Sequence, residues 1–178
     1  MESGKIPSGP WTLWFHNPED SKWSLSSFTK ISSFSTWEDF WTIINTFNKS
    51  ESQNISRTSK ESTDAFGEGM FFFMRDNIPP LWENSANIRG GGYSFRVQRK
   101  EAVELYLIYS IAAMINNLSV NPDNKINGIS ISPKKNFNII KIWNTNAQVF
   151  NNINDIKLQI KDQKPEEFIY SAFHQKRM

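Results

Sequence analysis

The sequence contains no cysteine, and this absence removes several kinds of chemistry. Without a thiol in its 178 residues, the chain cannot form disulfide bonds, hold zinc through cysteine or use a cysteine nucleophile. It has only two histidines, His16 and His174, and we expect both at the surface with no catalytic role. Its acidic residues are scattered, apart from adjacent pairs such as Glu166-Glu167, so the clustered carboxylates of a metal-dependent hydrolase are missing. We therefore expect no enzyme, no metal and no other cofactor.

Long apolar runs and a strong charge of one sign are also absent. No stretch approaches the roughly 20 apolar residues of a membrane-spanning helix, and the first ten residues lack the apolar segment of a secretory signal. The net charge is only +2, whereas a general nucleic-acid binder carries a dense basic stripe. We expect a cytoplasmic protein without membrane contact, whose contact with nucleic acid involves a few cations beside one pocket.

Aromatic residues, by contrast, are abundant, and seven of them are tryptophans. Tryptophan is large and seldom fully buried, so some of these rings should face a ligand or a partner. The length suits one domain with a sizeable core. We expect a flexible arm at 1–10, a single monomeric domain over 11–178, and a disordered loop at 48–64, where serine, asparagine and lysine prevail.

Hydrophobic patterning predicts the secondary structure. Short apolar or alternating runs predict strands at 11–15, 28–34, 70–74, 93–97, 128–132, 139–143 and 168–173. Helical spacing predicts helices from Ser35 onward, over 100–117 and within 147–160. Sequential hairpins interrupted by helices predict the α+β class, as a single curved antiparallel β-sheet with three helices packed on its convex face.

Two of these helices carry further detail. Ser35-Thr36-Trp37-Glu38 fits a capping box in which the Ser35 hydroxyl opens the helix and the carboxylate follows three residues later. In the long helix, the expected core-facing stripe consists of Val103, Leu107, Ile111 and Ile115.

Three features combine into a candidate binding site. Trp23 lies alone in a polar loop, Trp82 and Glu83 are adjacent in a proline-stiffened loop, and Lys134 and Lys135 lie in a turn. Two indoles can hold a cationic aromatic ring at about 1–2 kcal/mol each, a carboxylate can accept from its N–H groups, and lysines can meet phosphates. These are the requirements of 7-methylguanosine triphosphate, whose methylated guanine is positively charged.

Several motifs, in one order, resemble a known family. They are WTLWFHNPEDSKW at 11–23, FSTWEDFW at 34–41, IPPLWE at 78–83 with RGG at 89–91, INGISIS at 126–132 and IIKIW at 139–143. Their order and spacing over nearly the whole chain resemble the eukaryotic translation initiation factor 4E family. The resemblance implies a cupped sheet that holds the 7-methylguanosine cap of messenger RNA in its concave slot. It also implies that Trp23 and Trp82 stack on the base, Glu83 reads it, and Trp143 touches the N7-methyl group.

The phosphate end departs from the family pattern. Where the family presents an arginine and two lysines, an ungapped match places Lys134, Asn136 and Ile139. Gly92 stands where the family often has another arginine. Two of the three usual cations are therefore missing from their usual places.

Strand alternation suggests how the missing charge is replaced. Alternate residues of a strand point to the same face, so Lys141 should share the face of Trp143 and Ile139. We therefore predict that the cap phosphates are bound by Lys134, Lys135 and Lys141. The two turn lysines could equally be solvated surface residues.

A second surface is expected on the convex side. Trp37 and Trp41 lie four residues apart, so they share one helix face. The resemblance implies that Trp41, with Ile108 on the long helix, binds a helical peptide from a 4G-like scaffold factor or an inhibitory binding protein. Trp37 and Ala112 replace residues that are usual in the family, so the partner peptide should differ in sequence.

Three functions remain open on the sequence alone. The first is an initiation factor that recruits capped messenger RNA for translation, and the second is a cap-binding repressor that does not engage the usual scaffold. The third is a decapping hydrolase, which the scattered carboxylates disfavour. Trp143 and Trp41 could instead be core residues, since tryptophans on strands and helices commonly are.

Overall fold

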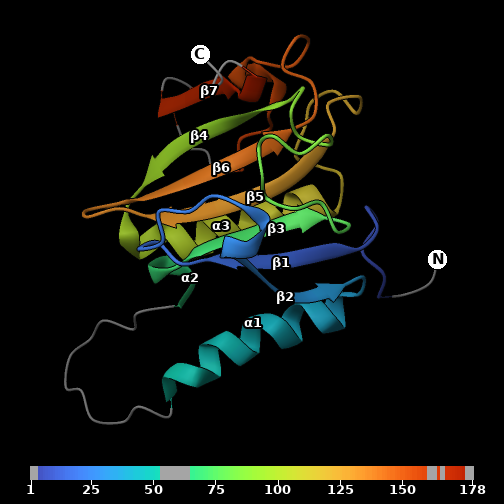
Figure 1. Ribbon diagram of the computed structural model, residues 1–178. Helices are drawn as coiled ribbons and strands as arrows, with labels where there is room; N and C mark the ends of the chain where they lie inside the picture. The colour runs from blue at the N-terminus through green and yellow to red at the C-terminus, as the bar shows by residue number, and fades with distance from the viewer. Residues whose placement is uncertain (1–3, 53–64, 160–163, 165–166, 175–178) are drawn as a thin grey trace.

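Seven strands form one antiparallel sheet in the order β2-β1-β3-β5-β6-β4-β7 (Figure 1). The computed structural model describes residues 4–52, 65–159, 164 and 167–174, with the backbone alone for 48–52. The strands are β1 Trp11–His16, β2 Phe28–Phe34, β3 Met70–Arg75, β4 Gly91–Val97, β5 Ile126–Pro133, β6 Asn138–Asn144 and β7 Phe168–Ala172. Each overlaps one of the predicted strands.

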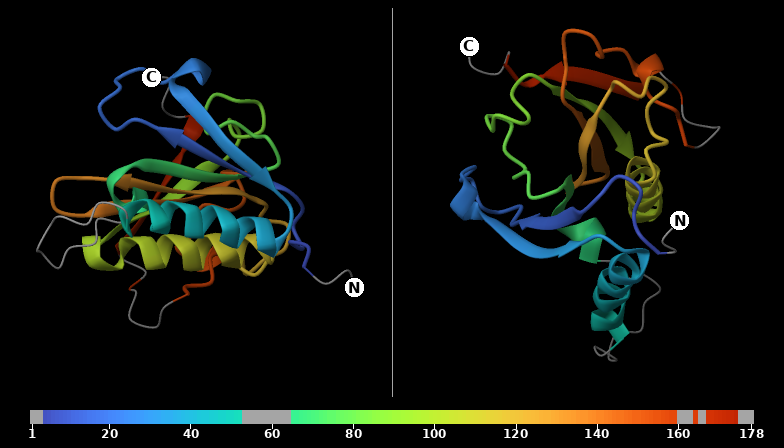
Figure 2. Two further views of the ribbon diagram at one scale, coloured as in Figure 1. Left: turned by 90° about the horizontal axis from the view of Figure 1, so that it is seen from below. Right: turned by 90° about the vertical axis from the view of Figure 1, so that its right-hand side faces the viewer.

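Three α-helices cover the convex face of this sheet, and the curvature opens on the other side (Figure 2). They are α1 Trp37–Ser52, α2 Ala65–Glu68 and α3 Arg99–Met114, and two short 3₁₀ helices are η1 Leu25–Ser27 and η2 Ile153–Asp155. The α+β class with a single sheet and three helices on one face is confirmed. Within the described segments, no helix combines the length and apolar character needed to cross a membrane.

The sheet separates two apolar clusters because alternate side chains point to opposite faces. The larger cluster fills the space under the helices and includes Leu13, Phe73, Ile129 and Ile142, all fully buried. The smaller one lies on the concave face and consists of Trp14, Phe28, Phe72, Met74, Trp143 and Phe173. The concave side therefore has an aromatic floor of its own.

The long helix α3 buries more of its surface than the predicted stripe. Tyr106 and Tyr109 are fully buried, and the Tyr106 ring stacks on Phe73 with centroids 5.3 Å apart. Of the predicted stripe, Val103, Leu107 and Ile111 are only half-buried, and Ile115 is exposed. Val103, Leu107 and Ile111 still pack against the larger cluster, so the stripe was predicted correctly for these three residues and wrongly for Ile115.

Helix α1 begins one residue later than predicted. Thr36, not Ser35, is the cap: the Asp39 backbone N–H donates to Thr36 Oγ1 at 3.1 Å, and the Thr36 hydroxyl donates to Asp39 Oδ2 at 2.7 Å. The Ser35 carbonyl is engaged elsewhere, because it accepts from the Ile6 N–H at 2.8 Å. Tertiary pairing has therefore shifted the cap by one position.

The first described residues are not the free arm that the sequence predicts. Ile6 is buried in the core, and Lys5 forms an isolated β-bridge with Thr36. The Gly4 carbonyl accepts from the Trp37 N–H at 2.8 Å. Residues 4–10 thus fasten the start of α1 to the sheet, and 1–3 lie outside the described residues.

Two further expectations need correction. Residues 48–52 continue α1, although they were expected in a disordered loop, and 53–64 lie outside the described residues. Over 147–159 the chain forms only the short η2 in place of the predicted helix. Asparagines explain this difference, because Asn146 Oδ1 accepts from two nearby backbone N–H groups and Asn152 Oδ1 accepts from that of Asn154. The third helix is instead α2, anchored by the fully buried Phe66.

Candidate ligand-binding site on the concave face

A cavity of about 400 Å³ opens on the concave face. Five residues predicted from the sequence line it, namely Trp23, Trp82, Trp143, Lys134 and Lys141. Its other lining residues are Met70, Phe72, Pro80, Ser130, Ser132, Ile139 and Phe173. The structure thus gathers aromatic and cationic side chains from segments more than 100 residues apart in one hollow. Glu83 and Lys135 are exposed and are not among the lining residues.

Trp23 is held at the mouth of the cavity by a neighbour that the sequence did not reveal. Its indole is 49% exposed and stacks on the His16 imidazole, with centroids 4.3 Å apart and planes 8° apart. His16 is fully buried, so the expectation of a surface histidine was wrong. As the last residue of β1, His16 falls on the concave side by the same alternation that buries Trp14.

The loop that carries Trp82 and Glu83 is braced by two asparagines. Asn87, fully buried, donates through its amide to the carbonyl oxygens of Pro79 at 3.1 Å and Leu81 at 2.8 Å. Asn127 on β5 donates to Asn87 Oδ1 at 2.9 Å and to the Ala86 carbonyl at 2.8 Å. These bonds replace secondary structure, because within 76–90 the loop has no strand or helix. Trp82, half-buried, packs against the concave cluster.

Trp143 forms part of the cavity floor. It is only 6% exposed, and its Nε1–H donates to Ser130 Oγ on the neighbouring strand at 3.0 Å. Its ring packs against Phe173 with centroids 4.9 Å apart and against Phe72 at 6.2 Å. The indole is therefore fixed in plane, with little freedom to turn when a ligand enters.

Lys141 follows the face predicted by alternation, since Ile139, Lys141 and Trp143 all line the cavity. Its ammonium nitrogen lies 5.9 Å from the Trp143 ring centroid. The Lys141 side chain passes over Gly92 on strand β4: a Cβ at Gly92 would lie 2.7 Å from Lys141 Cδ and 2.8 Å from Cγ. The absence of a side chain at Gly92 is thus what makes room for Lys141.

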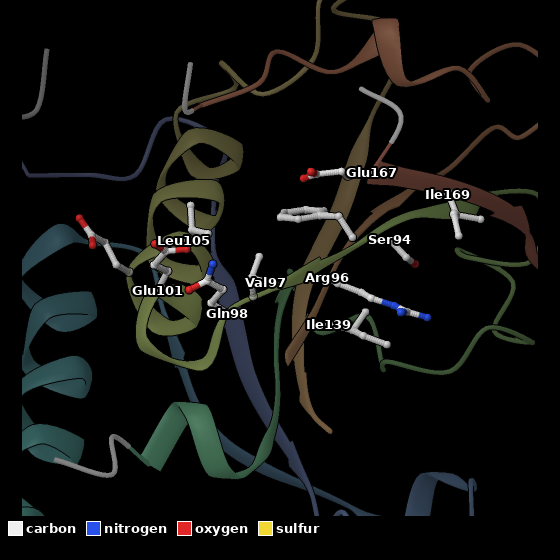
Figure 3. Close-up of a pocket in the computed structure, with 11 residues that line it drawn as sticks. Ser94, Arg96, Val97, Gln98, Glu101, Leu105, Ile139, Glu167 and Ile169 are labelled. Atoms are coloured by element: carbon white, nitrogen blue, oxygen red, sulfur yellow. The ribbon is translucent and has the colours of Figure 1, made fainter. Parts of the chain in front are cut away.

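A further cation, Arg96, lies beside this end and was missed in the sequence. A second cavity of about 820 Å³ shares Ile139 with the first and is lined by Ser94, Arg96 and Ile169 (Figure 3). Arg96 pairs in register with Ile139, and its guanidinium lies 4.9 Å from the Phe137 ring centroid. Alternation along β4 could have found it, because Gly92, Ser94 and Arg96 share one face.

The other wall of this second cavity is acidic. It is lined by Glu101 and Glu104 of α3 and by Glu167 before β7, and all three carboxylates are exposed. Figure 3 shows Glu101 beside the helix, on the opposite side of the view from Arg96 and Ile139. An anionic ligand would therefore favour the Arg96 side. Among the described residues, no group of three or more His, Asp or Glu side chains is arranged to hold a metal ion.

The residues predicted for partner binding lie on the helices of the convex face. Trp41 is 45% exposed, whereas Trp37 and Ile108 are half-buried. Trp37 packs edge-on against the buried Phe40, with centroids 5.8 Å apart. Trp41 is thus the most exposed of the three side chains, and Trp37 packs against the larger apolar cluster.

Comparison with known proteins places this geometry in a family. The family model described as Eukaryotic initiation factor 4E matches residues 8–177. The eukaryotic translation initiation factor 4E of Saccharomyces cerevisiae is 31% identical over 136 residues, which are 75% of this chain and 58% of the yeast protein. That of Candida glabrata is 32% identical over 137 residues, 75% of this chain and 59% of the relative. The chain thus spans less than two thirds of the length of these relatives.

Solved structures share the fold. Ascaris suum eIF4E-3 with m7G cap superposes with a TM-score of 0.62 at 18% identity, covering 82% of this chain and 76% of that one. The complex of C. elegans eIF4E-3 with the 4E-binding protein Mextli and cap analog gives a TM-score of 0.62 at 19% identity, with the same coverage. The family-model match extends over nearly the whole chain, and the chain therefore belongs to the eukaryotic initiation factor 4E family.

Proposed function

We propose that this protein binds the 7-methylguanosine 5′ cap of messenger RNA and recruits capped messenger RNA for translation initiation in the cytoplasm. The observation that carries the proposal is the single cavity in which Trp23, Trp82 and Trp143 meet Lys134 and Lys141. Structural neighbours named as cap complexes support it. In this role the protein is a monomeric binding module without catalysis, metal or cofactor.

The aromatic end would hold the methylated base. Trp23 and Trp82 would cover its two faces, and each indole would attract the cationic ring by about 1–2 kcal/mol once water is excluded. Trp143, fixed on the floor, would meet the N7-methyl group. Glu83 follows Trp82 directly and is exposed, so its carboxylate is free to turn and accept from the N–H groups of the guanine edge.

The cationic end would bind the triphosphate. Lys134 and Lys141 line the cavity, and Lys135 follows in the same turn. Arg96 would add a fourth cation from β4, because it lies in register beside Ile139, where the cavity ends. Its planar guanidinium can hold a phosphate with two parallel hydrogen bonds, which a lysine cannot do.

The convex face would engage a scaffold of the 4G type or an inhibitory binding protein. Trp41 offers the exposed ring, and Trp37 and Ile108 would extend the contact for a helical peptide. A neighbour solved with the 4E-binding protein Mextli supports such a surface in the family. A pull-down with a 4G-type peptide, compared with Trp41→Ala, separates two roles: binding lost in the variant supports an initiation factor. No binding by the unaltered protein would indicate a cap-binding repressor.

Tryptophan-fluorescence titration tests the cap-binding proposal directly. 7-Methyl-GTP should quench the emission, and GTP should do so far less, because only the methylated base is a cation. Trp82→Ala should weaken binding of the methylated nucleotide. Trp41→Ala is the matched control, since it removes an exposed indole from the opposite face. Equal quenching by both nucleotides would overturn the proposal.

A further inference from the structure

The rear face of the Trp23 indole is covered by a buried histidine, and this arrangement is unusual for a polar ring. His16 is fully buried, and its ring lies parallel to the indole at 4.3 Å between centroids. Phe28 packs against both rings, tilted against His16 with centroids 4.7 Å apart and edge-on to Trp23 at 5.9 Å. Trp23 therefore leans on a fixed stack at the cavity mouth.

His16 also holds the backbone next to Trp23. Its Nε2 lies 2.7 Å from the carbonyl oxygen of Lys22. A carbonyl can only accept, so Nε2 carries the proton and donates. Nδ1 is buried and, within the described part of the chain, has no hydrogen-bond partner. The Nε2–H tautomer suits this packing, because a proton on Nδ1 would be a buried donor with no acceptor.

We infer that His16 is a positioning residue for ligand binding, which fixes both the plane of the Trp23 indole and the backbone that carries it. This inference rests on the proposed cap-binding function. The loop before Trp23 is polar and largely exposed, so it offers little other support for the ring. Ordering a mobile side chain when a ligand binds costs conformational entropy. Because His16 already holds the Trp23 ring in place, binding does not incur this cost, and the affinity is higher.

Two substitutions of His16 separate its stacking on Trp23 from its hydrogen bond to the Lys22 carbonyl oxygen. His16→Phe keeps an aromatic ring of similar size behind the indole but loses the hydrogen bond to Lys22. His16→Ala loses both. Calorimetric titration with 7-methyl-GTP should show an affinity lowered about tenfold for His16→Ala and only a few-fold for His16→Phe. Retention of most of the affinity in His16→Phe would identify stacking as the larger contribution.

A double-mutant cycle distinguishes positioning from a general loss of structure. If His16 acts through Trp23, then adding His16→Ala or His16→Phe to Trp23→Ala should weaken binding less than about twofold further. Leu118→Ala is the control, because it removes a buried side chain from the cluster under the helices and should leave the affinity of the folded protein unchanged. His16→Phe keeps the cycle measurable if His16→Ala does not fold.

The outcomes separate this inference from the proposal on which it rests. Affinities unchanged in both His16 variants, or effects that persist in full without Trp23, would overturn the positioning role alone. An unaltered protein that binds 7-methyl-GTP and GTP equally would overturn cap binding itself. A loss with His16→Ala that disappears in the Trp23→Ala background supports the inference.

Discussion

The contact between Gly92 and Lys141 allows a sharp test of the phosphate end. A methyl group at Gly92 would lie 2.7 Å from Lys141 Cδ and 2.8 Å from Cγ, whereas non-bonded carbons prefer about 3.5–4.0 Å. Strand β4 is paired with β6 on one side and β7 on the other, so its backbone has little room to move. In Gly92→Ala, the Lys141 side chain must therefore turn away from its present path.

The size of the effect follows from the contact that would be lost. A hydrogen bond to a charged group contributes about 1.5–3 kcal/mol. Because Lys141 is only half-buried, we expect the lower figure, and about 1.4 kcal/mol corresponds to tenfold in affinity. The dependence of log affinity on log salt concentration should also become shallower by about 0.7, the value for one phosphate contact with a single strand.

The assay compares two ligands and two glycine variants. Fluorescence titration of Gly92→Ala should show weaker binding of 7-methyl-GTP and unchanged binding of the 7-methylguanosine nucleoside, which has no phosphate. Gly67→Ala is the matched control, since its Cβ would lie at an ordinary 3.5 Å from Val103 Cγ2. An unchanged affinity for the triphosphate, or an equal loss for the nucleoside, would refute the reasoning.

Other predictions address the loop that carries Trp82, the buried tyrosines and the contribution of Arg96. Asn87→Ala removes three hydrogen bonds and should lower the free energy of unfolding by about 2–4 kcal/mol in urea denaturation; an unchanged midpoint would contradict the bracing role. Burial raises the pKa of all four tyrosines, to about 12 for Tyr109 and Tyr170. Absorbance at 295 nm should therefore show little ionisation near pH 10 until the protein unfolds, and stability should fall as pH rises from about 10 to 12. Arg96→Gln combined with Lys141→Ala should flatten the salt dependence more than either change alone, and an effect no larger than that of Lys141→Ala would exclude Arg96.

The strands and the overall class were predictable because they depend on local alternation. Apolar runs bounded by turn residues identified all seven strands, and helical spacing identified α1 and α3. The predictions that failed concern features that depend on contacts with distant parts of the chain. Pairing of Ile6 with Ser35 shifted the cap of α1, and the packing of Tyr106 against Phe73 extended the buried surface of α3 beyond the predicted stripe. Neither contact leaves a signal in the neighbouring sequence.

The residues of the candidate site also fall into two groups, those that local sequence could predict and those that depend on distant contacts. Trp23 and Trp82 were predicted because a large apolar ring in a polar or proline-rich loop is conspicuous, whereas the role of Trp143 came only from the family resemblance. Lys141 was predicted because side chains alternate strictly along a strand. Arg96 was missed although alternation places it on the same face of β4 as Gly92 and Ser94, and its pairing with Ile139 brings that face beside the cavity. His16 was missed because its partner Trp23 comes from a loop of irregular path. The binding roles of all these residues stay predictions, and two of the residues, Glu83 and Lys135, do not line the cavity.

Hydrogen bonds from the side-chain amides of Asn87 and Asn127 hold the loop that carries Trp82, and this affects how the site responds to salt and pH. Asn87 and Asn127 hold that loop through groups that neither gain nor lose a charge. Salt and mild changes of pH should therefore leave the base-facing wall in place, while they alter how strongly the cations at the other end attract phosphate. In the proposed cap complex, the salt-sensitive part of the binding affinity thus comes from the cationic end, while the loop that carries Trp82 keeps its shape.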